Sequence, residues 1–375
     1  MAELTADSTS QDKLGPTYDS LKAVAAYSRG VERTALWSLI AAGVIMFVVF
    51  FIVNAGRESV PIVPDRGSVG FQGLIASILI SLVLTPYAYV RSTEFRNRSL
   101  PDAMRNKYTW FVIPVTIAIT LFLALVTGAF FEMITRSFEG LELSRLSASL
   151  RLASTMAVLA YILVSWVMRM RNSNLIYIAV FYLFATLLIS GAMHENPLWY
   201  QASFSYLGMT ESNSKFLFDI GLPFTGLLII IWSFYFKEYL NILLEDGIIT
   251  QRTRSLLHWG IVLSAVLLSM VGLVRFGMAP IFNVVHDASA TGMGVVLGLM
   301  MLFMPWMIKT FSRVFYIYSY VSVAMMVVAV VLMVMGVYSL TGLEMSAFVM
   351  ASVWLLIFYR NVDQLVIQQR PNLHI

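Results

Sequence analysis

The sequence lacks cysteine altogether and has few histidines and few charged residues. Among 375 residues there are no Cys and four His, and Asp, Glu, Lys and Arg together make up 12%. Without Cys, the chain forms no disulfide, thiolate metal site, cysteine nucleophile or iron–sulfur cluster. Ordinary soluble domains carry about 25% charged residues. The low charge therefore indicates that most of the surface faces a solvent other than water.

Long apolar runs take the place of the missing charges. Apolar residues make up 59% of the chain, and its mean hydropathy is +0.78. A membrane-spanning helix needs about 20 mainly apolar residues. Ten segments come near that length: 36 to 53, 71 to 90, 108 to 131, 152 to 168, 175 to 193, 216 to 236, 257 to 276, 288 to 308, 314 to 337 and 343 to 359. The sequence predicts an all-α, polytopic transmembrane bundle of about ten helices.

The basic residues predict the orientation of these helices, because Lys and Arg are retained on the cytoplasmic side of a membrane. With both termini inside, the outer connections hold Arg57, Arg66, Arg136, Arg145, Arg151, Lys215 and Arg275. The other eighteen of the 25 Lys and Arg residues then lie inside: Lys13, Lys22, Arg29, Arg33, Arg91, Arg96, Arg98, Arg105, Lys107, Arg169, Arg171, Lys237, Arg252, Arg254, Lys309, Arg313, Arg360 and Arg370. Removing or adding one helix would destroy this alternation.

The chain is expected to be almost wholly membrane-embedded. We predict a cytoplasmic N-terminal tail over 1–35, a four-helix membrane region over 36–168, a six-helix membrane domain over 175–365 and a cytoplasmic tail over 366–375. No small-residue cleavage pattern follows the first apolar run, so that run is interpreted as a retained anchor. The longest outer connection, from His194 to Lys215, is rich in aromatic residues that suit the head-group layer.

Two patches of small and polar residues stand out in the second half of the chain. The first consists of Ser205-Tyr206-Leu207-Gly208 before an expected helix, then Phe218-Asp219-Ile220-Gly221-Leu222 and Gly226 within it. The second consists of Gly272, Gly277 and Pro280 closing one helix, with His286 and Ala290 opening the next.

With these patches, residues 175–365 resemble the six-helix membrane family catalogued as domain of unknown function 998. That family is distantly similar to the damage-regulated autophagy modulator group and to proteins of GPI-anchor lipid remodelling. Asn is common in the family where Asp219 stands here. The resemblance implies a six-helix architecture and a lipid-facing role, and it does not extend to residues 36–168.

Ionisable residues are absent from the middle of the expected helices and gather at the predicted outer ends. The absence argues against a retinal protein and against a proton-coupled pump, which usually has a carboxylate near the membrane midplane. The outer-end residues are Glu132, His194, Glu195, Asp219, Arg275, His286 and Asp287. Because they share one depth, they are the candidate site.

Within this set, we predict His286 and Asp219 as catalytic residues, with Asp219 orienting His286 as the acid or base. Arg275 is expected to bind a phosphate or carboxylate, because its planar guanidinium suits bidentate anions. Asp287, His194 and Glu195 are further candidate ligand-binding residues, and two imidazoles with carboxylates would suit zinc. The alternatives are a carboxylate that stabilises a helix N-terminus and a histidine that only bonds a neighbouring helix.

The residues after His286 predict a contact face. Ala290, Gly294 and Gly298 follow it at intervals of four, which places them on one stripe of a helix. The small residues would permit close approach of another helix, within the chain or in a homo- or hetero-oligomer. No basic face or motif for nucleic acid is present.

The leading functional hypothesis is a plasma-membrane protein, prokaryotic by its short connections and its resemblance, that binds or modifies membrane lipid at the outer leaflet. If it is an enzyme, a membrane-embedded lipid hydrolase or transferase is expected. A small-solute transporter is the second hypothesis, since Pro114, Pro223 and Pro305 fall within expected helices. A structural or accessory membrane subunit is the third.

Overall fold

The computed structural model describes residues 16–62, 67–97, 112–138, 140–170, 175–209 and 213–369. Within these ranges, ten helices are long and apolar enough to cross a membrane, and two three-residue strands accompany them. The prediction of an all-α, multi-pass membrane protein is confirmed. The chain divides after Met170 into two compact units, which are described separately.

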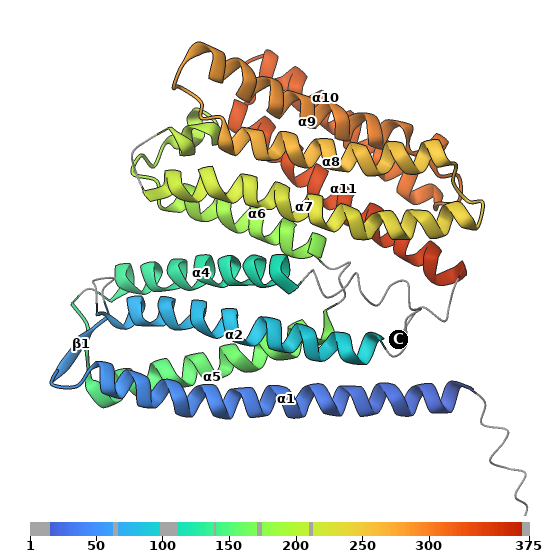
Figure 1. Cartoon of the computed structure of the whole chain (residues 1–375). Coiled ribbons are helices and arrows are strands. Elements are labelled where there is room, and N and C mark those ends of the chain that lie inside the picture. The colour runs from blue at the N-terminus through green and yellow to red at the C-terminus, as the bar shows by residue number, and fades with distance from the viewer. Residues whose placement is uncertain are drawn as a thin grey trace, which may run out of the picture. The chain divides into compact units, whose positions relative to one another are not determined.

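The four-helix unit covers residues 16–170. Its elements are α1 (Pro16–Val53), β1 (Ser59–Pro61), α2 (Val69–Asn97), α4 (Val112–Ser137), β2 (Glu142–Ser144) and α5 (Arg145–Arg169). The first helix packs mainly along α5, and α2 contacts both α4 and α5 (Figure 1). The two strands pair antiparallel with Ser59 opposite Ser144, so they join the α1–α2 connection to the α4–α5 connection.

Neutral polar side chains pair inside this unit. The amides of Asn54 and Gln72 exchange two hydrogen bonds of 2.9 Å, and each also donates to a carbonyl, Phe50 O at 2.9 Å and Gly67 O at 2.8 Å. Deeper in the unit, the hydroxyls of Ser81 and Thr120 join α2 to α4 at 2.9 Å. Buried polar groups cost free energy unless they are bonded. These pairs therefore fix how the helices pack.

The six-helix unit covers the described residues from 175 to 369. Its helices are α6 (Leu175–Ala192), α7 (Asn213–Glu245), α8 (Gln251–Leu273), α9 (Pro280–Met307), α10 (Arg313–Val334) and α11 (Leu340–Gln369). Two short 3-10 helices, η4 (Trp199–Gln201) and η5 (Phe204–Gly208), lie in the connection between α6 and α7. Successive helices pack side by side, and α11 returns to contact α7 and α6 (Figure 1).

Glycines hold α7 close to its neighbours. A Cβ added to Gly226 would lie 2.4 Å from the Ala265 carbonyl oxygen of α8, and one added to Gly272 would lie 2.3 Å from Pro223. On the other side of α7, a Cβ at Gly221 would lie 2.2 Å from Thr186 of α6. No real Cβ fits at such distances, so these glycines let the helices approach closely. Three of the residues on which the predicted resemblance rests are thus packing positions.

The two ends of the six-helix unit differ in character. One end, here called the aromatic end, holds stacked rings from α7, α10 and α11, including Trp354 and Phe358 at 5.1 Å and Trp232 and Phe236 at 4.8 Å. The indole of Trp354 also donates to Ser319 at 2.9 Å. At the opposite end, called the polar end, α6, α8 and α10 finish and α7, α9 and α11 begin. The candidate residues of this unit lie at the polar end.

Several helices begin or end away from the predicted limits. The first helix starts at Pro16, well before the predicted span at 36, and α11 continues to Gln369. Pro280 opens α9 and does not close the preceding helix, because proline fits the first turn, where its missing N–H costs nothing. Pro114 likewise lies in the first turn of α4, whereas Pro86, Pro223 and Pro305 lie inside helices.

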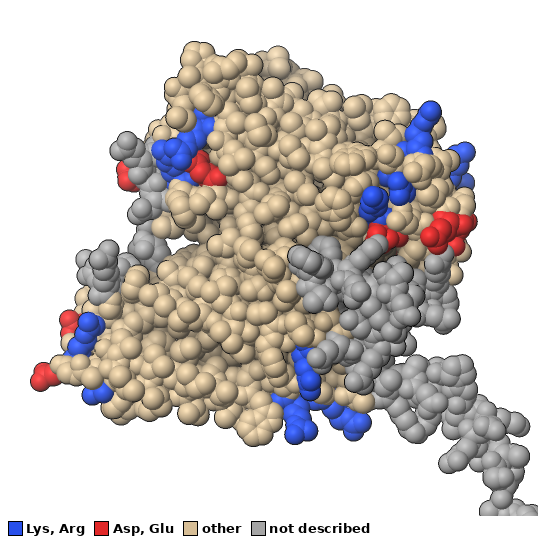
Figure 2. All heavy atoms as spheres, in the orientation of Figure 1, with Lys and Arg blue, Asp and Glu red and all other residues tan. Residues whose placement is uncertain are grey.

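Charged side chains lie near the helix ends in each unit. Figure 2 shows the Lys, Arg, Asp and Glu residues of this face gathered at the two ends of each unit, with uncharged residues covering the stretch between them. This distribution agrees with helices whose middle portions contact hydrocarbon.

Candidate functional site

The polar end of the six-helix unit brings an ion pair to the surface. Asp219, in the second turn of α7, lies 2.8 Å from Nε of Arg275, which follows the end of α8. The Asp219 side chain is 12% exposed and the Arg275 side chain 45%. The two terminal nitrogens of Arg275 make no hydrogen bond to any residue in the described ranges. Asp219 thus fixes one edge of the guanidinium and leaves the other edge open.

His286 lies in the second turn of α9 and is only 2% exposed. Its Nδ1 is 2.8 Å from the carbonyl oxygen of Val274, and its Nε2 is 2.6 Å from the hydroxyl of Ser205. The ring of Phe276 packs edge-on against the imidazole at 5.6 Å. Both ring nitrogens are engaged, so the Val274 carbonyl, and not Asp219, orients this histidine.

Two further residues complete the polar end, and sequence reasoning did not assign them a role. Ser205 lies in η5, and Glu344 lies in the second turn of α11. The Glu344 carboxylate accepts a 2.7 Å hydrogen bond from the backbone N–H of Phe204, the first residue of η5. Ser205 was visible only as part of a motif, and Glu344 only as a lone carboxylate in the last expected span.

These contacts connect the candidate residues into one cluster, here called the polar cluster: Ser205, Asp219, Arg275, His286 and Glu344. His286 bonds the residue before Arg275, and Arg275 pairs with Asp219. A Cβ on Gly208, the last residue of η5, would lie 3.1 Å from Oδ1 of Asp219. Asp219 therefore lies close to η5, the same short helix that carries Ser205. The polar cluster can offer an anion site at Arg275 and a base at His286.

The other three candidate residues lie at the same end with different surroundings. His194 is buried, hydrogen-bonds Asn196 of its own turn at 3.1 Å and packs against Tyr206 at 5.4 Å. Glu195 and Asp287 are exposed. Asp287 follows His286 in sequence, but its side chain takes no part in the bonds of the polar cluster.

The arrangement does not gather a ligand set for zinc. Among the described residues, no group of three or more His, Asp or Glu side chains stands close enough to hold a metal ion. The expected combination of His286, Asp287, Asp219 and His194 is divided, because each histidine is bonded within a different part of the polar end.

The glycine stripe on α9 has an open face. His286 is buried, but a Cβ added to Gly294 or Gly298 would meet no atom within 4 Å. The small residues are therefore not used for close packing against the described helices of this unit, unlike Gly226 and Gly272. Docking of another subunit on the Gly294/Gly298 face stays a prediction.

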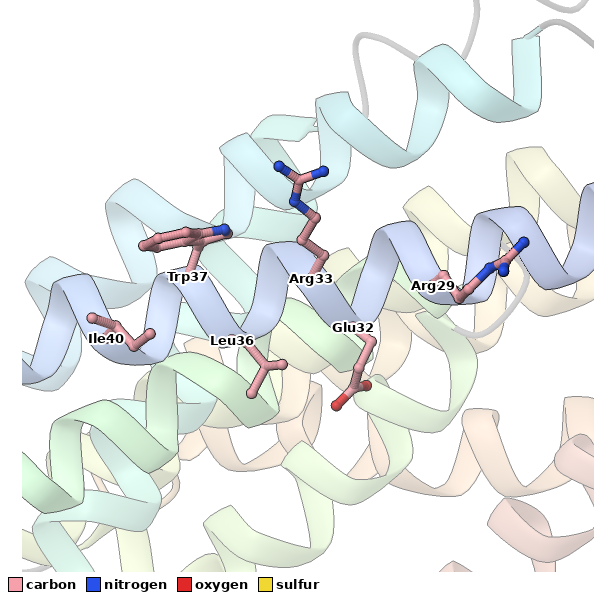
Figure 3. Close-up of a pocket in the computed structure, with 6 residues that line it drawn as sticks. All are labelled: Arg29, Glu32, Arg33, Leu36, Trp37 and Ile40. Atoms are coloured by element: carbon pink, nitrogen blue, oxygen red, sulfur yellow. The ribbon is translucent and has the colours of Figure 1, made fainter.

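A surface hollow occurs in the four-helix unit, away from these candidates in the sequence. It runs along α1 and is lined by Arg29, Glu32, Arg33, Leu36, Trp37 and Ile40 (Figure 3). Glu32 is already engaged, since it accepts a 2.6 Å hydrogen bond from Tyr161 and lies 3.6 Å from Arg169. Basic residues beside a tryptophan are typical of a helix passing through the head-group layer.

Comparison with protein-family models, curated proteins and solved structures finds no match to this chain. The resemblance of residues 175–365 to the domain of unknown function 998 stays a prediction. The function must therefore be argued from the polar cluster itself.

Proposed function

We propose that this protein binds the phosphate of an anionic membrane lipid at the polar end of its six-helix unit, through Arg275. The observation that carries the proposal is the half-exposed guanidinium, held at Nε by Asp219 with its terminal nitrogens unbonded to the described residues. Such an arginine presents two parallel N–H donors in the geometry that a phosphate accepts. Asp219 has the role of a positioning residue.

The neighbours of Arg275 favour a lipid over a water-soluble anion. Met278, Ile281 and Val284 follow it closely in sequence and are each at least 64% exposed. A cation beside exposed apolar side chains matches an amphiphile, whose phosphate lies at the head-group layer and whose acyl chains extend along the helices. The excess of basic residues at the opposite helix ends favours the outer leaflet of the membrane for this site.

The proposal can be tested with Arg275→Gln in the full chain. Purified protein in detergent would be titrated with phosphatidylglycerol, with phosphatidylcholine as the uncharged reference, and binding followed by native mass spectrometry. Charge-assisted hydrogen bonds contribute about 1.5–3 kcal/mol, so we expect phosphatidylglycerol affinity to fall roughly 10- to 100-fold. Arg275→Lys should lie between, because lysine keeps the charge but loses the bidentate geometry.

Arg151→Gln is the matched control. Arg151 is an exposed arginine of α5 in the four-helix unit, on the same predicted side of the membrane. We expect it to bind phosphatidylglycerol as the unaltered protein does. If folded Arg275→Gln and folded Arg151→Gln bind phosphatidylglycerol with equal affinity, the proposal of a head-group site at Arg275 is wrong.

A further inference from the structure

The contact between Ser205 and His286 has a defined direction. The Val274 carbonyl can only accept a hydrogen bond, so Nδ1 of the imidazole carries the proton in the bond of 2.8 Å. In the neutral ring, Nε2 is then an acceptor, and the Ser205 hydroxyl donates to it across 2.6 Å. The order of groups is hydroxyl, imidazole, orienting oxygen.

This order matches the requirement for an activated hydroxyl nucleophile. A serine becomes nucleophilic when a base lies within hydrogen-bond reach of its hydroxyl and a third group holds that base in place. Here the third group is the backbone carbonyl of Val274, and the burial of His286 keeps its ring in one orientation. Ser205 itself is half-buried and so can be reached from outside the unit.

The segment that carries Ser205 is fixed from several sides. Glu344 of α11 binds the first N–H of η5 at 2.7 Å, and His286 of α9 binds the next residue. Leu207 and Gly208 at its end are buried, and η5 packs against α7. The N–H of Ser205 makes no hydrogen bond to any residue that the structure describes. It is therefore a free donor beside the hydroxyl, suited to a developing oxyanion.

We propose that Ser205 is the nucleophile of an acyl-transfer reaction, with His286 as its general base and an ester-linked anionic phospholipid as substrate. The nucleophile rests on the contacts of Ser205 and His286 alone. The substrate class also rests on the proposed function, because Arg275 directly follows Val274, the residue that orients His286. A phosphate held at Arg275 brings the ester linkages of the same lipid to the polar cluster.

The reaction balances with water as the only co-reactant. The Ser205 hydroxyl proton passes to Nε2 of His286 while Oγ bonds to the ester carbonyl carbon. The ester C–O bond then breaks, and the departing lysophospholipid oxygen takes the proton from Nε2. Water then attacks the carbonyl carbon of the acyl-serine and gives a proton to Nε2. The bond between that carbon and Oγ breaks, which releases a fatty acid, and Nε2 returns the proton to Oγ of Ser205.

The nucleophile is tested by labelling the full chain in nanodiscs with an alkyl fluorophosphonate, which reacts with activated serines without needing a head group. We expect one labelled peptide, carrying Ser205, and no label in Ser205→Ala. His286→Gln should react at least ~100-fold more slowly, the usual loss of a general base. Ser203→Ala, two residues away with no histidine partner, should react like the unaltered protein. Absence of label on Ser205 would overturn the nucleophile.

A second variant keeps the test decisive if His286→Gln does not fold. The chain has no cysteine, so Ser205→Cys and Ser203→Cys each carry a single thiol. Iodoacetamide alkylation of Ser205→Cys should show an inflection well below the free-thiol value of about 8.5, because the neighbouring imidazole stabilises the thiolate. Ser203→Cys should titrate near that free value. Matching profiles for the two variants would also overturn the proposal.

The substrate class has a separate readout. Nanodiscs of phosphatidylglycerol should yield fatty acid and lysophospholipid in equal amounts, and Ser205→Ala should abolish both. Arg275→Gln should raise KM for phosphatidylglycerol, and its effect on fluorophosphonate labelling should be much smaller than that of His286→Gln. Labelled Ser205 without lysophospholipid would overturn the phospholipid substrate but keep the nucleophile. Lipid binding without labelling would overturn the nucleophile and keep the head-group site.

Discussion

Two polar sites of this protein, the Asn54–Gln72 pair in the four-helix unit and the polar cluster in the six-helix unit, use their hydrogen-bonding groups in different ways. In the four-helix unit, the Asn54 and Gln72 amides use all four of their N–H groups on each other and on two carbonyls. In the six-helix unit, Arg275 forms an ion pair through one nitrogen, and the backbone N–H of Ser205 is unbonded among the described residues. Polar groups that satisfy one another hold helices together. Groups with spare donors are the ones that can bind a ligand.

The largest loss of stability is expected for a substitution at Gly226, which lies between α7 and α8 of the six-helix unit. In Gly226→Val, the new side chain would clash with the α8 backbone at Ala265, so α7 and α8 must separate. Overpacking of this kind costs about 1–3 kcal/mol, and more where backbone must move. We expect a strong loss of folded protein, measured as thermal unfolding in detergent.

Gly294→Ala is the control for Gly226→Val. The space around Gly294 is open, and alanine is a better helix former than glycine by about 1 kcal/mol. Its unfolding temperature should be unchanged or slightly raised. A folded Gly226→Val protein with normal stability would show that the six-helix unit does not depend on the α7–α8 contact.

A loss of stability of intermediate size is expected for a substitution at Asn54, and it would test whether the four-helix unit depends on its paired amides. In Asn54→Leu, the buried amide of Gln72 loses its partner, and an unsatisfied buried group costs about 1–3 kcal/mol. The double variant Asn54→Leu/Gln72→Met removes both amides and should recover part of that loss. A double-mutant cycle of chemical unfolding measures the coupling. Additive losses would show that the two amides do not act as a structural pair.

The smallest effect is expected at Glu32. Its ion pair with Arg169 is 3.6 Å long between side chains that are 44% and 53% exposed, and exposed pairs contribute about 0–1 kcal/mol. Glu32→Gln keeps an oxygen for the Tyr161 hydroxyl, so the loss in unfolding free energy should stay below about 1 kcal/mol. A larger loss would mean that an ionised group is structurally essential in the four-helix unit too.

The spanning helices could be predicted from the sequence because a helix needs about 20 mainly apolar residues to cross a membrane, and runs of that length can be counted directly. What hydropathy could not show is helix outside those runs. The polar residues before Leu36 are helical from Pro16, and α9 begins six residues before His286. Helix limits in such regions depend on caps and on tertiary contacts, which an apolar count does not register.

The candidate site was predictable only in part, for a related reason. A shared depth was enough to select Asp219, Arg275 and His286 as candidates. It could not indicate that His286 meets Ser205, because 81 positions separate the two in the chain, nor that Glu344 reaches Phe204 across 140. Such pairs follow from how α9 and α11 pack against η5, and no spacing in the sequence encodes that packing.

The pairing of β1 with β2 has a consequence for biosynthesis. β1 follows the first helix, yet its partner precedes α5, and α1 packs mainly along that same last helix of the unit. When the chain emerges in order, α1 enters the membrane without its main neighbour and meets it only after α2 and α4 have been made. Pairing of β1 with β2 becomes possible once α2 and α4 have been made and before α5 is complete, so the ribbon places the start of α5 beside the end of α1.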